Sequence, residues 1–121
     1  MEKEFITYKQ ALALKELGFD ERCFSRYYES GKLADSLSYL HHNYFGQVNA
    51  PLYQQAFRWF REKHNLQAEI LWRGDMECFC YKTGKFKRGS HNFSKDDYKT
   101  YEEAESACLD KLIEITRLTK S

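Results

Sequence analysis

Apolar residues recur at the spacing of one helical face in three segments of the chain. In the clearest segment these positions are Tyr53, Ala56, Phe57, Phe60 and His64. Asn49 precedes them as a candidate N-cap, and Pro51 suits the first turn because its missing N–H leaves no intrahelical bond unmade there. We therefore predict a central helix that begins near Asn49 and covers a sheet.

The other two predicted helices begin at capping boxes. Thr7 with Gln10, and Thr100 with Glu103, have the spacing at which an N-cap hydroxyl and a side chain three residues later satisfy free amides of the first turn. Gly18 is placed to end the first helix in a left-handed conformation. The last helix is expected to run nearly to the C-terminus. Its apolar stripe consists of Ala104, Ala107, Cys108, Leu112 and Ile115.

Runs of β-branched and aromatic residues bounded by turn residues predict the strands. The first hairpin has a strand at residues 23–28, a turn around Gly31 and a return strand that opens at Leu33. Residues 37–45 fit neither the helical nor the strand period, so a strand and an irregular connector both stay open there.

A second set of strands follows the central helix. It consists of strands at residues 66–72 and 76–81 and a third from Phe86, with turns at residues 73–75 and 82–85. The predicted order is α-β-β-α-β-β-β-α. We expect an α+β fold in which an antiparallel sheet of hairpins is covered on one face by three helices, forming a single domain over residues 1–121.

Composition narrows the class of protein without indicating a function. The formal net charge is +1, so there is no overall electrostatic field to attract the chain to nucleic acid or to an anionic membrane. Only local clusters of charged residues can therefore indicate a charged partner. The N-terminus lacks the apolar stretch of a signal peptide, and no window approaches the roughly 18 apolar residues of a membrane span. We expect a cytoplasmic protein with no membrane partner.

Four cysteines, Cys23, Cys78, Cys80 and Cys108, are interpreted as small apolar residues. A reduced compartment is expected without a secretory signal, and Cys78 and Cys80 share one face of a strand, where regular geometry disfavours a disulfide. We expect this pair to pack against a helix. Zinc is disfavoured because the cysteines and histidines lack the paired spacing of structural sites, and no cofactor is predicted.

Basic side chains gather between Lys82 and Lys95 and alternate with aromatic residues. The cations are Lys82, Lys85, Lys87, Arg88 and Lys95, joined by His91, and the rings are Tyr81, Phe86 and Phe93. Cations neutralise phosphates and exposed rings stack on unpaired bases, so the segment is a candidate nucleic-acid site. A half-buried strand with its rings inward and its cations in solvent gives the same alternation, and we favour this second interpretation.

The chain has more large aromatic rings than a core of this size normally absorbs. The candidates for a protein interface are Tyr27, Tyr28, Tyr39, Tyr44 and Trp72. Exposed Tyr and Trp are enriched in protein interfaces, but the same rings also fill a thick core between helices and a sheet. Both interpretations stay open.

The sequence contains no recognisable catalytic motif. His41 and His42 titrate near neutral pH, as a general base requires, but no nucleophile accompanies them. There is no glycine-rich phosphate loop and no nucleophile elbow. We expect that the protein is not an enzyme. A small enzyme or small-ligand binder would need a pocket near His41, His42 or His64.

Three segments carry a resemblance to a group of proteins. They are Thr7 to Phe19, the motif PLYQQAFRWFREKHNL from Pro51 to Leu66, and Thr100 to Ala104. On these motifs the chain resembles a group of small proteins of gut anaerobic bacteria and their phages. The resemblance implies a small single-domain protein often carried on mobile elements, and it implies no activity and no site residue.

Two functions are expected from these features. The first is a non-enzymatic accessory protein of a phage or mobile element that binds protein, either a second copy in a homo-oligomer or a host protein. The alternative is a nucleic-acid binder that uses residues 82–95, with an affinity that falls steeply as salt is raised.

Overall fold

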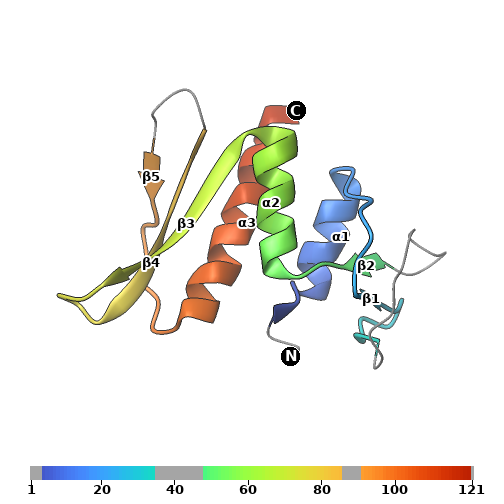
Figure 1. The fold of residues 1–121 in the computed structure, drawn as a ribbon, viewed down its shortest axis with the longest axis horizontal. Coiled ribbons are helices and arrows are strands. Elements are labelled where there is room, and N and C mark those ends of the chain that lie inside the picture. Colours follow the sequence, from blue (N-terminus) through green and yellow to red (C-terminus); the bar gives the residue numbers. More distant parts are fainter. Residues whose placement is uncertain (1–3, 35–47, 86–90, 121) are drawn as a thin grey trace. The chain divides into compact units, whose positions relative to one another are not determined.

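The computed structural model describes residues 4–34, 48–85 and 91–120 (Figure 1). In these residues three helices and five strands follow one another in the order α-β-β-α-β-β-β-α, which confirms the predicted α+β class and element order. The elements are α1 (Tyr8–Glu16), β1 (Ser25–Tyr27), β2 (Val48–Ala50), α2 (Tyr53–His64), β3 (Leu66–Arg73), β4 (Cys78–Lys85), β5 (His91–Phe93) and α3 (Tyr101–Lys120).

The chain groups into two compact units, Met1–Ala56 and Phe57–Ser121, and the boundary lies within α2. The strands are divided between two antiparallel sheets: β1 pairs with β2 in the first unit, and β3, β4 and β5 lie side by side in the second. The strands therefore form two antiparallel sheets, whereas the sequence pattern predicts a single sheet. α1 packs against β2, and α3 packs against β3 and β4.

Local capping chemistry sets both ends of α1. The Thr7 hydroxyl accepts from the Gln10 amide at 3.1 Å, and the Gln10 side chain accepts from the Thr7 amide at 2.9 Å, so the predicted capping box is confirmed. At the other end Gly18 has φ +102°, and the Phe19 amide donates to the Leu14 carbonyl at 2.9 Å. This glycine-ended closure is the predicted one, because only a residue without Cβ adopts that conformation at no cost.

The turn predicted at Gly31 is also confirmed. Gly31 has φ +89°, and the Tyr28 amide donates to the Lys32 carbonyl at 2.9 Å. The return strand predicted from Leu33 is limited to one bridge between Leu33 and Tyr27 in the described residues. The principal partner of β1 is instead β2. Residues 37–45, for which two interpretations stayed open, lie outside the described residues.

The predicted start of α2 is wrong. Asn49 is a strand residue paired with Arg26, and α2 begins four residues later at Tyr53. The buried Asn49 amide nitrogen donates to the Glu21 carbonyl at 2.9 Å, and the Pro51 carbonyl accepts from the Ile6 amide at 3.1 Å. These long-range bonds hold the segment extended, and they outweigh the local preference of Asn for an N-cap.

In the second unit β3 and β4 form a ladder of eight residue pairs that runs from Leu66 opposite Lys85 to Arg73 opposite Cys78. The turn predicted at residues 82–85 is therefore wrong, because those residues continue β4. Thr83 and Gly84 are buried in the sheet and pair with Ala68 and Gln67. Tertiary pairing overrides the turn preference of the Lys-Thr-Gly-Lys sequence.

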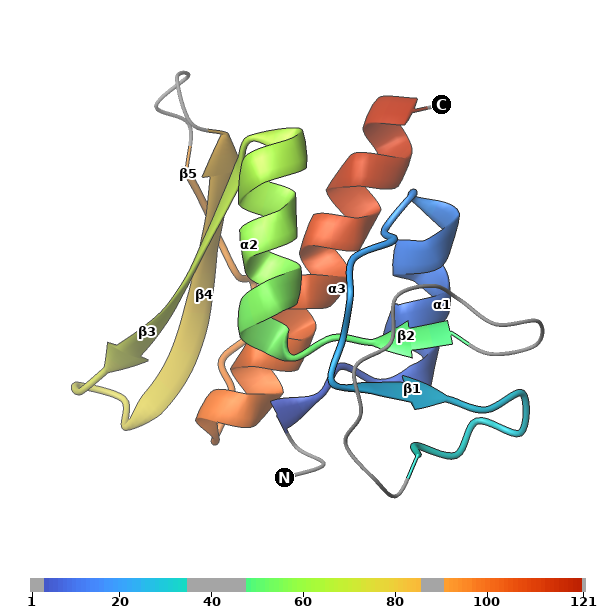
Figure 2. The same ribbon diagram turned by 45° about the vertical axis from the view of Figure 1, so that its right-hand side comes forward.

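α3 covers one face of this sheet through its contacts with β4 and β3. Figure 2 shows the two long strands β3 and β4 side by side. Thr100 is the N-cap of α3: the Thr100 hydroxyl accepts from the Glu103 amide at 3.1 Å and donates to the Glu103 carboxylate at 3.0 Å. The predicted cap is confirmed, but the Glu103 side chain bonds the Thr100 hydroxyl in place of the Thr100 amide that a capping box requires. Ala104, Cys108 and Leu112 of the predicted stripe are buried, and Ala107 and Ile115 are half-buried. Leu109 and Ile113 are buried beside them, so the buried stripe is wider than predicted.

All four cysteines are buried and free, in agreement with their interpretation as small apolar residues. Phe79 and Tyr81 face α3, because the Phe79 ring lies 5.9 Å from that of Tyr101 and Tyr81, two residues further along β4, shares its face. Burial raises the pKa of Tyr81 to about 12. Because side chains alternate along a strand, Cys78 and Cys80 point to the opposite face. Cys78 and Cys80 therefore do not pack against α3, and the expectation that this pair packs against a helix is wrong for that helix.

A buried hydroxyl offers a test of this packing. Among the described residues Thr83 Oγ1 has no hydrogen-bond partner, whereas the buried Thr116 Oγ1 donates to the Leu112 carbonyl at 2.9 Å. We expect Thr83→Val to raise the free energy of unfolding by about 1 kcal/mol, since valine keeps the shape and removes an unpaired polar group. Thr116→Val, the matched control, lowers it by about 1 kcal/mol or less. Urea unfolding measures both, and a loss of stability in Thr83→Val contradicts the packing described.

The buried thiols predict a loss of stability in alkali. Burial raises the pKa of Cys23 and of Cys108 to about 12 from 9.0. As pH rises from about 9 the unfolded chain releases these protons before the folded chain does, so the free energy of unfolding falls. Urea unfolding at about pH 8 and about pH 10 measures the fall. In Cys108→Ala it is smaller than in the wild type, and an equal fall in both proteins contradicts the assignment.

Candidate functional site

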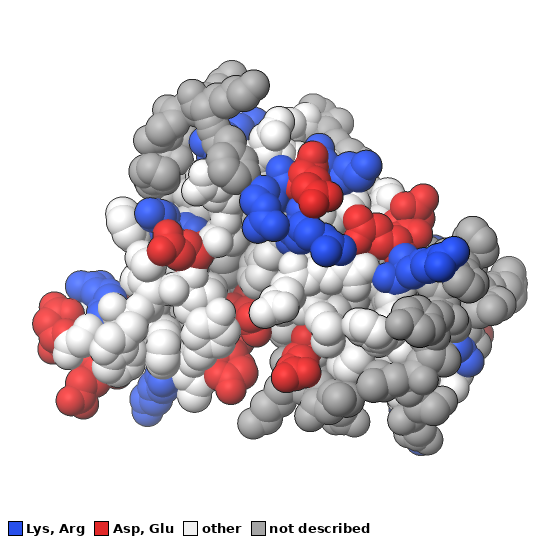
Figure 3. Space-filling model, in the orientation of Figure 1, with Lys and Arg blue, Asp and Glu red and all other residues white. Residues whose placement is uncertain are grey.

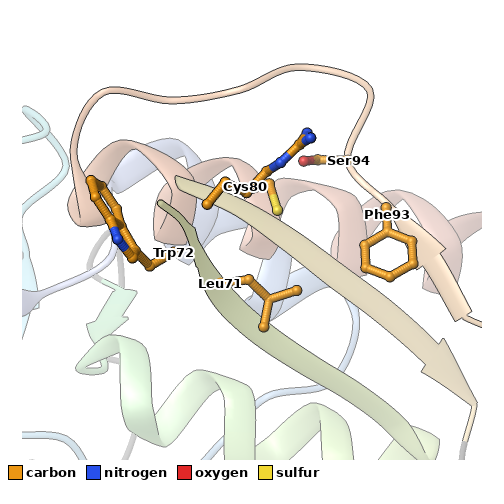
Figure 4. Close-up of a pocket in the computed structure, with 6 residues that line it drawn as sticks. Leu71, Trp72, Cys80, Phe93 and Ser94 are labelled. Carbon is orange, nitrogen blue, oxygen red and sulfur yellow. The ribbon is translucent and has the colours of Figure 1, made fainter. Parts of the chain in front are cut away.

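The outer face of the second sheet, on the side away from α3, carries an open hollow of about 460 Å³. It is lined by Leu71, Trp72, Arg73, Cys80, Phe93 and Ser94 (Figure 4). The close-up shows these side chains coming from β3, β4 and β5 and from the residue that follows β5. The hollow is therefore a feature of the sheet itself.

The strand register assembles this hollow. Leu71 lies opposite Cys80, and Lys82 of the same β4 face lies opposite Phe93. Directly opposite residues of an antiparallel pair point to the same face, so Leu71, Cys80 and Phe93 share the outer face. The Ser94 amide donates to the Tyr81 carbonyl at 2.8 Å, which continues the pairing just beyond β5.

Charged side chains around the hollow are paired with one another. An Arg73 guanidinium nitrogen lies 3.4 Å from Asp97 Oδ1, and Lys82 Nζ lies 3.4 Å from Glu69 Oε2. Exposed pairs of this kind contribute roughly 0–1 kcal/mol to stability. They do reduce the positive charge of the outer face, and Figure 3 shows Lys or Arg next to Asp or Glu over the part of the molecule that holds β3, β4 and β5.

A group of exposed apolar side chains lies at the end of the β3–β4 hairpin. We call Trp72, Met76, Phe79 and Tyr101 the tip cluster. The Trp72 ring lies 4.9 Å from the Phe79 ring, which lies 5.9 Å from the Tyr101 ring. Trp72 is 57% exposed, Met76 in the connecting turn 55% and Tyr101 46%. The three rings therefore form a continuous aromatic row in which the half-buried Phe79 lies between the exposed rings of Trp72 and Tyr101.

The predicted basic segment is only partly assembled. Lys85 and Lys95 are exposed, Lys82 is half-buried in its ion pair, and His91 lies in β5 opposite Gly84. Lys87 and Arg88 lie outside the described residues, as does Phe86.

The favoured interpretation of residues 82–95 is a half-buried strand whose rings point inward. This prediction is wrong for Phe93. Phe93 is 63% exposed. It lies on a three-residue edge strand whose outer face no described helix covers, so alternation does not bury it. Tyr81 does turn inward, and its ring stacks at 6.2 Å on that of Tyr98, which lies in the segment before α3.

The rings predicted for a protein interface have different roles. The Tyr27 hydroxyl donates to the Ile6 carbonyl at 2.6 Å and its ring meets Tyr8 edge-on at 5.5 Å, so it holds the first unit together. Tyr28 lies under the Arg26 guanidinium at 5.5 Å. Tyr39 and Tyr44 lie outside the described residues. Trp72 is exposed, and it is the predicted residue that the structure places on an accessible apolar surface.

The Cys78 thiol, beside Cys80 on the outer face of β4, is not activated as a nucleophile. Burial, and then the Asp97 carboxylate, raise the pKa of Cys78, so its thiol is protonated at neutral pH and is a poor nucleophile. His64 contacts the Trp59 ring at 4.9 Å and the Phe60 ring at 5.8 Å, which is a packing role. His41 and His42 lie outside the described residues. Within the described ranges no group of three metal-ligating residues is brought together.

The exposure of Met76 and Tyr101 is not predicted by the sequence pattern. Met76 is predicted as the first residue of a strand at residues 76–81, and this is wrong: the turn spans residues 74–77 and β4 begins at Cys78. In that turn an apolar residue has no core to enter, so Met76 is exposed. Tyr101 opens α3 outside the predicted stripe. Its exposure follows only from where α3 meets the sheet.

Comparison with known proteins finds no family model, no curated protein and no solved structure that matches the chain. None of the helices in the described ranges has both the length and the hydropathy needed to cross a membrane.

Proposed function

We propose that this protein is a non-enzymatic binding protein that contacts another protein through the tip cluster. The observation that supports this most directly is the row of Trp72, Phe79 and Tyr101, because its two end rings are exposed and held by the half-buried Phe79. Met76, in the turn between β3 and β4, is exposed as well. Trp, Tyr and Met are enriched in protein interfaces. Rings already ordered against one another lose little conformational freedom on binding.

The wider role we propose is that of an accessory protein of a phage or mobile element that binds a host protein. This part of the proposal is supported by the resemblance carried by the segments that begin at Thr7, Pro51 and Thr100. The tip cluster lies outside those segments except for Tyr101.

A capture experiment tests the proposal. Immobilised wild-type protein is exposed to a lysate of the source organism, and bound proteins are identified against the double variant Trp72→Ser with Met76→Ser. We expect the double variant to capture a specific partner in an amount at least about tenfold lower than the wild type does. The reason is that removing a residue at the centre of an interface costs more than about 1 kcal/mol of binding free energy.

Leu118→Ser is the matched control for this experiment, because Leu118 is also an exposed apolar residue but lies at the far end of α3. The control retains the partner. Equal capture by wild type and double variant, with both folded by circular dichroism, would falsify a role for the tip cluster.

Nucleic-acid binding is a second candidate, favoured by the exposure of Phe93. Its ring lies opposite Lys82 and two residues before the exposed Lys95, so cations and an accessible ring do occur together on this hairpin. The ion pairs of Lys82 and Arg73 weigh against it, because paired cations release fewer counterions when they meet phosphates.

Titration with labelled single-stranded and double-stranded nucleic acid at low and raised salt tests this second candidate. If it is correct, Phe93→Ala weakens single-strand binding by about 5-fold to 150-fold through lost stacking. Lys85→Glu lowers the affinity at low salt, while Lys63→Glu on α2, also exposed, leaves it nearly unchanged. Absence of binding at low salt rejects this candidate and leaves the protein-binding proposal in place.

A further inference from the structure

β3 is an edge strand of eight residues. In the described part of the second unit its only sheet neighbour is β4, so the backbone groups on its other edge are not engaged in a ladder. An unpaired edge presents a row of N–H and C=O groups that pair readily with another strand. β5, the opposite edge, has only three residues. The longer free edge is therefore that of β3.

The exposed half of β3 lacks the usual features that prevent strand pairing. From Glu69 to Arg73 there is no proline, and the ladder with β4 continues without an extra residue, so no bulge bends the edge away. Two charged side chains are present, and they have opposite signs. This half of the strand is apolar between them.

This segment is complementary to itself when two copies run antiparallel. If Leu71 lies on the two-fold axis opposite Leu71 of a second copy, Glu69 lies opposite Arg73 of that copy, and the reverse pair repeats the contact. Ile70 then lies opposite Trp72 on the other face. Opposite charges and aromatic–β-branched pairs are the cross-strand pairs that stabilise sheets.

We infer that β3 pairs antiparallel with β3 of a second copy of this chain, joining two three-stranded sheets into one of six strands. Within one copy Glu69 is paired with Lys82 and Arg73 with Asp97, each at 3.4 Å, and the antiparallel register adds a second opposite charge to each. This self-complementarity argues for a second copy as the occupant, because an unrelated strand would match both charges only by chance. Leu71, which lines the hollow, then contacts Leu71 of the other copy, and Trp72 of the tip cluster gains a partner. This inference rests on the proposed function, because it names a second copy of the chain as one protein partner of the surface that includes Trp72.

Cysteine cross-linking tests the register between β3 of one copy and β3 of the other. Leu71→Cys is made in a Cys80→Ser background, because Cys80 faces Leu71 across the hairpin and would compete for the new thiol. In the proposed register two copies of residue 71 have Cα atoms about 4.5–5.5 Å apart, within disulfide range. We expect most of the protein to form a covalent dimer under mild oxidation.

Glu69→Cys in the same background is the matched control. Its partner is Arg73, so two copies of residue 69 lie about 14 Å apart, beyond the reach of a disulfide. Equal cross-linking of residues 69 and 71 overturns the register. No cross-linking of either variant, with wild-type circular dichroism in both, overturns the pairing.

Charge exchange gives a second measurement that does not depend on a buried substitution. In sedimentation equilibrium Glu69→Arg and Arg73→Glu each weaken dimerisation at least about tenfold, because each places like charges opposite one another twice. The double variant returns to within about threefold of the wild type. Glu62→Arg, an exposed residue of α2, has no effect. A double variant as weak as either single variant overturns the inference.

The outcomes separate this inference from the proposed function. A wild-type protein that stays monomeric at about 100 μM, yet captures a partner that depends on Trp72 and Met76, overturns the β3 pairing and leaves the proposed function standing. A dimer that cross-links at residue 71 supports the pairing even where no other partner is captured.

Discussion

The antiparallel ladder between β3 and β4 is the constraint on which the second unit depends. Its register sends Phe79 and Tyr81 toward α3 and leaves Leu71 and Cys80 on the outer face. Because side chains alternate with a period of two, a slip of one residue would exchange the two faces of a strand. Core and accessible surface are thus two consequences of the same hydrogen-bonded pairing.

That pairing also explains why the tip cluster is ordered although it is exposed. Phe79 is half-buried and contacts Tyr101 on one side and Trp72 on the other. The row therefore continues core packing into solvent, with ring separations in the range where aromatic pairs attract. Exposed rings that are already held in place suit recognition, because little side-chain entropy remains to be lost on binding.

The first unit depends on buried polar groups that find partners at a distance. Gln10 closes the capping box of α1 and also accepts from the Tyr53 hydroxyl at 3.2 Å. The Asn49 side chain reaches the Glu21 carbonyl. Buried polar groups cost free energy unless they are hydrogen-bonded, so these bonds fix how the chain passes from β2 into α2.

Features of the fold that depend on neighbours in sequence were determined by the sequence alone. The capping box at Thr7, the N-cap at Thr100, the left-handed Gly18 and the apolar face of α3 belong to this group, since their atoms lie within a few residues of one another. Only the tertiary structure decided that Asn49 and residues 82–85 are strands, because pairing partners distant in sequence outweigh local preference. It alone also decided that Trp72 and Phe93 are exposed, since the face a strand residue occupies depends on the strand and helix placed against it.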